Sequence, residues 1–153
     1  GKELSALPQQ TPSINKKNAM PSAMRIAVAL LIQAPYLYTK ITTPINVELL
    51  KQSGNSLLTE LLEMISPETK TSQIIEHWRY SEQLSIVNKL AMLPLNIPEE
   101  GFLEELIGSL KLIEKSTLQN QINRLLYKAN EGSLTLDEKK RLQDMIRHQK
   151  IKH

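Results

Sequence analysis

The sequence predicts an all-α protein. Leu and Ile supply most of its large apolar residues, whereas aromatic residues make up only 4% of the 153 residues, a balance typical of packed helices and not of β-sandwiches. Apolar residues recur at helical spacing in several stretches, and no alternating run of β-branched residues is long enough for a strand. We therefore expect a compact bundle of about five helices followed by a long helix that forms a C-terminal helical hairpin.

The chain begins with a stretch that we expect to be a linker or disordered tail. Residues 1–21 contain Pro8, Pro12 and Pro21 among many polar residues, with too few apolar residues to offset the entropy lost on ordering. Because the first residue is Gly1 and not Met, we expect the chain to be a piece of a longer protein. The remainder divides into a helical-bundle subdomain over residues 22–114 and a C-terminal hairpin subdomain over residues 115–153.

The first predicted helix runs from about Ser22 to Gln33. It is apolar almost all round, which indicates a position at the centre of a core, and Pro35 ends it or changes its direction. Shorter helices are expected after it, bounded by Pro, Gly and Ser residues. They span residues 36–41, a brief segment between Pro44 and Ser53, then residues 56–65, 71–80 and 82–93.

A long helix follows from Pro98 to Asn130. Its length of about 50 Å, at 1.5 Å per residue, is too great for burial on one compact bundle. Its apolar stripe shifts in phase between Glu114 and Thr117, which marks a candidate subdomain boundary. The far half of the helix must therefore find another partner.

The last helix is expected to be that partner. Residues 130–133, with sequence Asn-Glu-Gly-Ser, supply a C-cap and a turn, and Thr135 with Glu138 has the spacing of a capping box. Apolar residues of the last helix can then face apolar residues of the long one, namely Leu142, Met145 and Ile146 against Leu118, Ile122 and Leu125. The apolar stripe of the long helix also includes Leu126. A hairpin this small buries little apolar area, so we expect its stripe to be available to another protein's helices.

The net charge of +3 is mildly basic, and its distribution is more informative than its size. Cations crowd the end of the chain, where Lys139, Lys140, Arg141, Arg147, Lys150 and Lys152 face a lone Asp144. Cations in the last turns of a helix are favoured by its dipole, and the same cations could form a binding face. The sequence leaves both interpretations open.

No catalytic, metal or cofactor site is expected. The chain has no Cys and only two Asp residues, both in the last helix, so neither thiolate metal sites nor a two-metal centre is plausible. His77 and Glu76 are adjacent on a helix and point about 100° apart, which prevents them from sharing a metal. Trp78 is interpreted as a core anchor, and no Gly-rich phosphate loop is present.

Cysteine usage and hydropathy bear on location. The absence of Cys is compatible with a reducing cytoplasm. The longest uncharged run, Ile26 to Thr39, spans about fourteen residues. A membrane-spanning helix needs about 20, so we expect no membrane association.

Four features together resemble a known family, the C-terminal helicase-binding domain of bacterial DNA primase of the DnaG type. They are Met24-Arg-Ile-Ala-Val-Ala-Leu-Leu-Ile-Gln-Ala-Pro35, Ile74-Ile-Glu-His-Trp-Arg79, Asn88-Lys-Leu-Ala-Met92 and a final hairpin with a basic end. The resemblance implies a helical bundle with a C-terminal hairpin, similar in fold to the N-terminal domain of the hexameric helicase that it binds. It also implies a non-catalytic domain that docks primase onto the replicative helicase, in the cytoplasm at the replication fork and nucleoid.

The resemblance implies two sets of contact residues. The hairpin would contact the helicase N-terminal domain, through Leu142, Met145, Ile146, Arg147, Gln149, Lys150 and Lys152. The bundle would bind the acidic C-terminal tail of single-stranded DNA-binding protein, through Met24, Arg25, Val28 and Lys89. At Arg25 an ordinary surface Arg paired with a nearby Glu is an alternative. No sequence-specific nucleic-acid binding is implied, and a stand-alone nucleic-acid-binding or regulatory module is the alternative function.

Overall fold

The structure is a computed structural model that describes the backbone of residues 20–152 and the side chains of residues 20–149. Within this range every regular element is a helix, and a long helix leads into the C-terminal hairpin. The predicted all-α class and architecture are confirmed. The linker predicted for residues 1–21 falls almost wholly outside the described residues.

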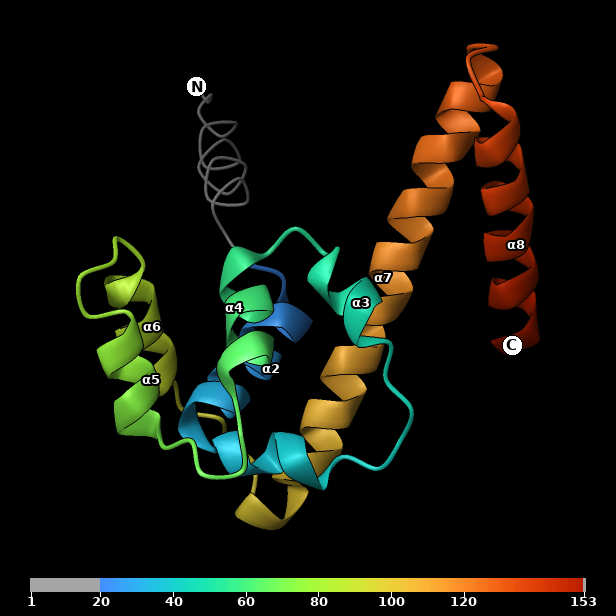
Figure 1. Cartoon of the computed structure of the whole chain (residues 1–153). Coiled ribbons are helices and arrows are strands. Elements are labelled where there is room, and N and C mark those ends of the chain that lie inside the picture. The colour runs from blue at the N-terminus through green and yellow to red at the C-terminus, as the bar shows by residue number, and fades with distance from the viewer. Residues whose placement is uncertain (1–19, 153) are drawn as a thin grey trace, which may run out of the picture.

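Helix α2 (Ser22–Gln33) lies at the centre of the bundle (Figure 1). Its consecutive residues Ala27 to Ile32 are all 0% exposed, because other helices cover every side of it. It packs against α7, α6, α4 and α5. Pro35 ends it as predicted and starts the 3₁₀ helix η2 (Pro35–Lys40). This central position explains why the first helix lacks a polar face.

Helices α3 (Val47–Lys51) and α4 (Ser56–Met64) are each capped by an asparagine. The Asn46 side chain accepts a hydrogen bond of 3.0 Å from the Leu49 amide, and Asn55 accepts one of 2.9 Å from Leu58. Such caps satisfy amides that have no partner within the helix. Gly54, just before the second cap, has a φ of +91°, which favours glycine.

Helices α5 (Thr71–His77) and α6 (Leu84–Ala91) form an antiparallel pair on the side of the bundle away from the hairpin (Figure 1). Both are shorter than predicted, because residues 78–83 form tight turns between them. Trp78 is 2% exposed in this turn, and its indole N–H donates to Gln83 at 3.2 Å. Its interpretation as a core anchor is confirmed.

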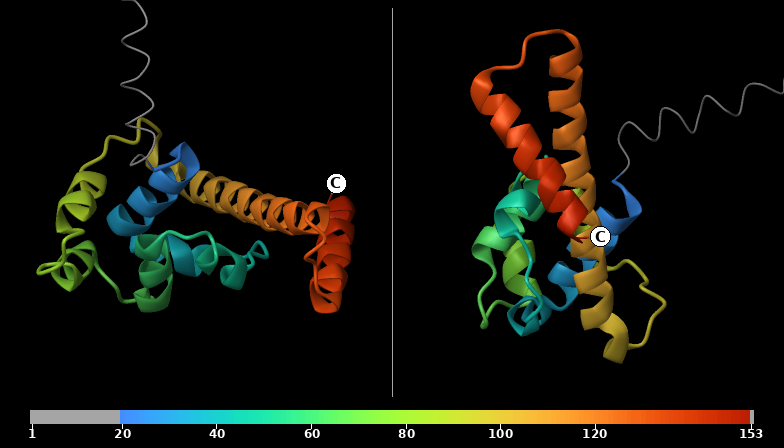
Figure 2. Two further views of the ribbon diagram at one scale, coloured as in Figure 1. Left: turned by 90° about the horizontal axis from the view of Figure 1, so that it is seen from above. Right: turned by 90° about the vertical axis from the view of Figure 1, so that its right-hand side faces the viewer.

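A short 3₁₀ helix η3 (Glu99–Gly101) leads into α7 (Phe102–Asn130), a helix of 29 residues. In its first half Leu106, Leu110 and Ile113 pack into the bundle core. The helix then continues beyond the bundle without a break (Figures 1 and 2). Where it leaves, Glu114 is only 4% exposed, and its carboxylate accepts a hydrogen bond from the Asn46 backbone amide. A charged group therefore joins the long helix to the cap of α3.

The turn after α7 has the hydrogen bonds of a Schellman motif. Gly132 has a φ of +74°, and its amide donates to Ala129 at 3.1 Å while the Ser133 amide donates to Lys128 at 3.0 Å. Helix α8 (Leu136–Lys152) then begins with the predicted capping box, in which Thr135 Oγ1 accepts from the Glu138 amide and Glu138 Oε1 accepts from the Thr135 amide. Both local predictions are confirmed.

The described residues form two separate apolar clusters. The larger one fills the bundle, and the smaller contains Ile122, Leu125 and Leu142, with Leu118, Leu134, Met145 and Ile146 partly buried around it. We call residues 115–152, the far half of α7 together with α8, the hairpin. Two clusters support the predicted division between residues 114 and 115, which stays a prediction. None of the helices in the described range combines the length and apolarity that crossing a membrane requires.

Candidate functional site

The hairpin uses three of its seven predicted contact residues for its own packing. Leu142 is 8% exposed, and Met145 and Ile146 are partly buried on the same small cluster. The structure therefore brings these three together with Ile122 and Leu125 of α7. What they offer to a partner is the part of each side chain that the hairpin leaves uncovered.

The remaining predicted contact residues lie towards the end of α8. Arg147 is exposed, with its guanidinium 3.4 Å from Asp144 one turn earlier. Gln149 is partly buried and donates a hydrogen bond of 2.6 Å to Gln119, which ties the end of α8 to α7. The side chains of Lys150 and Lys152 lie outside the described residues.

Exposed apolar side chains near the tip of the hairpin were not predicted. Leu126 is 45% exposed, Tyr127 66% and Leu136 74%. The predicted apolar stripe of the long helix included Leu126, but adjacent helical residues point about 100° apart, so Leu125 and Leu126 cannot both face α8. The adjacent positions of Leu125 and Leu126 could therefore have indicated that one of the two side chains is exposed.

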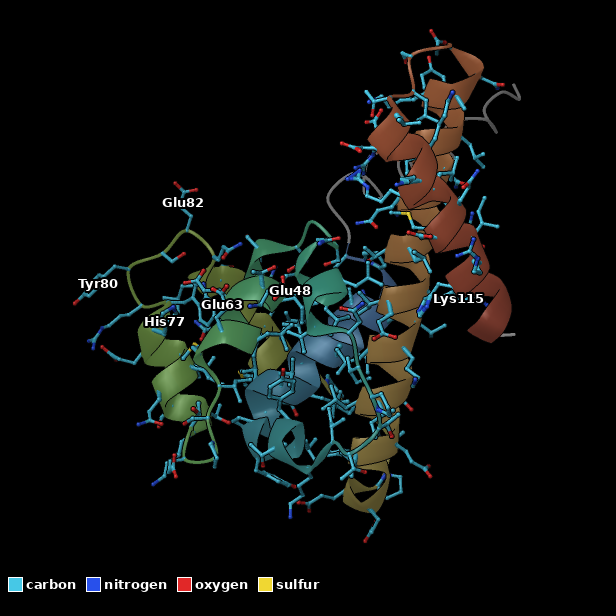
Figure 3. All side chains as sticks on the ribbon, turned by 45° about the vertical axis from the view of Figure 1, so that its right-hand side comes forward. Glu48, Glu63, His77, Tyr80, Glu82 and Lys115 are labelled. Atoms are coloured by element: carbon cyan, nitrogen blue, oxygen red, sulfur yellow. The ribbon has the colours of Figure 1, made fainter. Side chains whose placement is uncertain are left out.

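Two grooves flank the hairpin. The first, of about 490 Å³, lies between the two helices of the hairpin and the end of α3; its lining residues are Gln52, Gln121, Arg124, Leu125, Lys128, Glu138, Arg141 and Met145. The second, of about 320 Å³, lies where the end of α8 faces the bundle, and it is lined by Asn46, Leu49, Lys111, Glu114, Lys115, Leu118, His148 and Gln149. Lys115, labelled in Figure 3, lines this second groove from α7.

One ion pair closes the tip of the first groove. Lys128 Nζ lies 2.5 Å from Glu138 Oε2, and this hydrogen bond, followed by the one from the Thr135 amide, holds the pKa of Glu138 below its usual value. The side chains of Gln52 and Gln121 form a hydrogen bond of 2.6 Å at the other end of the groove, joining α3 to the hairpin.

The predicted acidic-tail site is only partly assembled. Arg25 and Lys89 are both exposed, on α2 and α6, which pack against each other. Met24 and Val28, expected as apolar walls, are 6% and 0% exposed and belong to the bundle core. In the described part of the chain no carboxylate forms an ion pair with Arg25, so the alternative of an Arg paired with a Glu is not what this structure shows.

The side chains with catalytic or metal-binding potential do not converge. His77 Nε2 lies 2.7 Å from Glu60 Oε2, a pair at the surface. Among residues 20–149 no three His, Asp or Glu side chains gather in a way that could hold a metal ion. Tyr80, 93% exposed, points into solvent beside Glu82 on the far side of the bundle from the hairpin (Figure 3).

Comparison with known proteins adds a family match. The family described as "DNA primase DnaG DnaB-binding" matches residues 24–145. The chain is 31% identical over 128 residues to a DNA primase of Legionella pneumophila, a match that covers 82% of this chain and 22% of that protein. It is 24% identical over 125 residues to a DNA primase of Pasteurella multocida strain Pm70, covering 80% and 22%.

A solved structure of a primase domain is also similar to this chain. The DnaG primase C-terminal domain from Vibrio cholerae aligns with a TM-score of 0.66 and 30% sequence identity, covering 82% of this chain and 96% of that one. The chain thus spans nearly the whole of that C-terminal domain but about a fifth of the length of the curated primases that it matches.

Proposed function

The chain belongs to the family of DnaB-binding domains of DNA primase DnaG, and from this premise we propose that it docks a primase onto the replicative helicase. In this role it is a non-catalytic interaction domain that couples the priming of DNA replication to unwinding at the replication fork. Synthesis of primers would belong to other parts of the parent primase.

The observation that carries the proposal is the separation of the hairpin from the bundle. The tip of the hairpin extends away from the bundle (Figure 1), and the hairpin has a small apolar cluster of its own, while the Gln52–Gln121 hydrogen bond ties its base to α3. Exposed Leu126, Tyr127 and Leu136 lie near its tip. A free-standing pair of amphipathic helices can pack against helices of another protein, the usual way in which helical surfaces associate.

The proposed contact surface combines the predicted residues with the tip. Met145 and Ile146 would contribute their uncovered parts, and Arg147, Gln149, Lys150 and Lys152 would supply polar contacts around them. Leu142 would act by holding the two helices together, because it is 8% exposed. This assignment favours an apolar centre with a polar rim, the common anatomy of protein interfaces.

Titration of the whole chain with the N-terminal domain of the helicase tests the proposal. We expect saturable binding that survives an increase in ionic strength, since an apolar interface depends little on counterion release. A chain that binds nucleic acid instead would lose affinity steeply as salt rises. Absence of helicase binding at any salt concentration would contradict the proposed function.

We further propose that the exposed cations Arg25 and Lys89 receive the acidic C-terminal tail of single-stranded DNA-binding protein. Two cations on adjacent helices, without an ion-pair partner among the described residues, suit a carboxylate-rich peptide. Met24 and Val28 would support the site from within the core, because both are buried.

Replacing Arg25 with Ala tests this site. Because Arg25 is exposed and unpaired, Arg25→Ala should leave the fold intact and weaken binding of an acidic tail peptide by about tenfold, the change expected for one charge-assisted contact of about 1.5 kcal/mol. Fluorescence anisotropy of a labelled peptide measures the change. Arg79→Ala, on the same bundle but paired with Glu76, is the matched control and should bind like the unmodified chain. Equal affinity of the Arg25 variant rejects the assignment.

A further inference from the structure

Charge is divided unevenly between the two parts of the molecule. Residues 20–114 hold seven Lys and Arg against eleven Asp and Glu, whereas residues 115–153 hold nine against four. Figure 3 labels three of the bundle's carboxylates, Glu48, Glu63 and Glu82, and Lys115 near the base of the hairpin. The hairpin therefore attracts a negative partner over most of its surface, whereas on the bundle such a partner is favoured only at local clusters of cations.

The face of α7 that packs on the bundle changes chemistry where the bundle ends. Leu106, Leu110, Ile113 and Thr117 follow one another at helical spacing and are all buried. The same face continues through Gln121, Arg124 and Lys128, at spacings of three and four residues. The part of this face that extends past the bundle thus presents amide and cationic groups where the lower part presents Leu and Ile.

These groups line the first groove, where Arg141 of α8 joins them from the opposite wall. Lys128 is occupied by Glu138, but neither Arg124 nor Arg141 has an ion-pair partner among the described residues, and both are exposed. Two unpaired guanidinium groups on facing helices can each give parallel hydrogen bonds to one anionic group. The groove therefore presents two unpaired guanidinium groups beside the Lys128–Glu138 ion pair.

The rest of the groove favours a nucleic acid over an acidic peptide. Leu125 is 5% exposed, so Met145 is the one lining residue with apolar surface to offer, and the groove lacks the buried apolar pocket in which protein interfaces anchor a side chain. One turn from Arg124, Tyr127 exposes 66% of its surface, and such a ring can stack on a base. Stacking of this kind needs an unpaired base, which a single strand presents and a duplex does not.

We propose that this groove binds the phosphate backbone of a single-stranded nucleic acid, without sequence preference. Arg124 and Arg141 contact phosphates, Gln121 and Gln52 offer amides beside them, and Tyr127 stacks on a base next to the groove. Its two cations, Arg124 and Arg141, are not among the proposed helicase contacts or the Arg25 site, although Met145 and Tyr127 also lie on the proposed docking surface.

Paired charge reversals distinguish binding in the groove from a general attraction to the net positive charge of the hairpin. Arg124→Glu with Arg141→Glu removes both groove cations, whereas Lys140→Glu with Arg147→Glu changes the charge equally on exposed α8 residues that do not line it. Binding of a labelled oligothymidylate to the whole chain is measured at low salt, without helicase. We expect the groove variant to bind on the order of tenfold more weakly than the α8 control, with a salt slope shallower by about 0.7 for each phosphate that it no longer neutralises.

A second pair of variants keeps the result interpretable if charge reversal disturbs the hairpin. Arg124→Gln with Arg141→Gln removes the charges with a smaller change in side-chain chemistry. This variant should also bind the oligonucleotide more weakly than the α8 control, and its circular dichroism spectrum should match that of the unmodified chain. Equal weakening by the groove and control variants would overturn the proposal, because it would show only a general attraction. Equal binding of a duplex, or competition by a glutamate-rich peptide of the same charge, would also overturn it.

Discussion

Deletion of Thr135 to His153 should abolish binding to the helicase N-terminal domain and leave the bundle folded. The deletion removes α8 and uncovers Ile122 and Leu125 of α7, which are 3% and 5% exposed in the intact chain. An isolated half-helix is marginal in water, so the far half of α7 should also fray. Both helices that form the proposed docking surface are then disrupted together.

Calorimetric titration and fluorescence report the two parts of this result separately. The single Trp78, buried in the bundle, should keep its emission spectrum in the truncated chain, because none of its packing partners is removed. Helicase binding should fall below detection in the same sample. Retained affinity would remove the hairpin from the mechanism and move the docking surface to the bundle.

Leu30→Ala should produce a large decrease in stability. Leu30 is 0% exposed at the centre of α2, where surrounding helices cannot collapse into the space that the substitution leaves. We expect the free energy of unfolding to fall by about 2–5 kcal/mol. Urea denaturation followed by Trp78 fluorescence measures it.

Leu125→Ala in the small cluster is the matched comparison for Leu30→Ala. The same number of carbon atoms is removed, but Leu125 packs within the hairpin. Leu125→Ala should leave the urea unfolding transition followed by Trp78 fluorescence nearly unchanged. Amide exchange in α8 should become faster, because the hairpin opens without unfolding the bundle. An equal shift of the Trp78 transition by both substitutions would show that the two clusters unfold as one unit, against the division at residues 114 and 115.

Local sequence signals were sufficient for the elements and for several of their ends, although α5 and α6 are shorter than predicted. The uninterrupted apolar run before Pro35 identified the central helix, and the Thr135 and Glu138 spacing identified the start of α8. These features depend on residues close together in the chain, whose propensities act before any tertiary contact forms. The phase shift between Glu114 and Thr117 also marked the place where α7 changes partners, although the helix itself is continuous there.

The surfaces of the hairpin could not be predicted in the same way. The first groove depends on Gln52 meeting Gln121 across 69 residues of sequence, and no local pattern encodes that meeting. The resemblance implied Met145 as a partner contact, yet its side chain also packs in the hairpin's own cluster. A pattern of apolar residues indicates that a face is buried, but not how much of each side chain its own partner helix covers.

Hydrogen exchange of the whole chain, with and without the helicase N-terminal domain, tests most directly whether the hairpin is the docking element. Slower exchange on complex formation should be confined to α8 and to α7 beyond Thr117, while α2, α4, α5 and α6 exchange as they do in the free chain. Protection that appears in the bundle and leaves the hairpin unchanged would contradict the account.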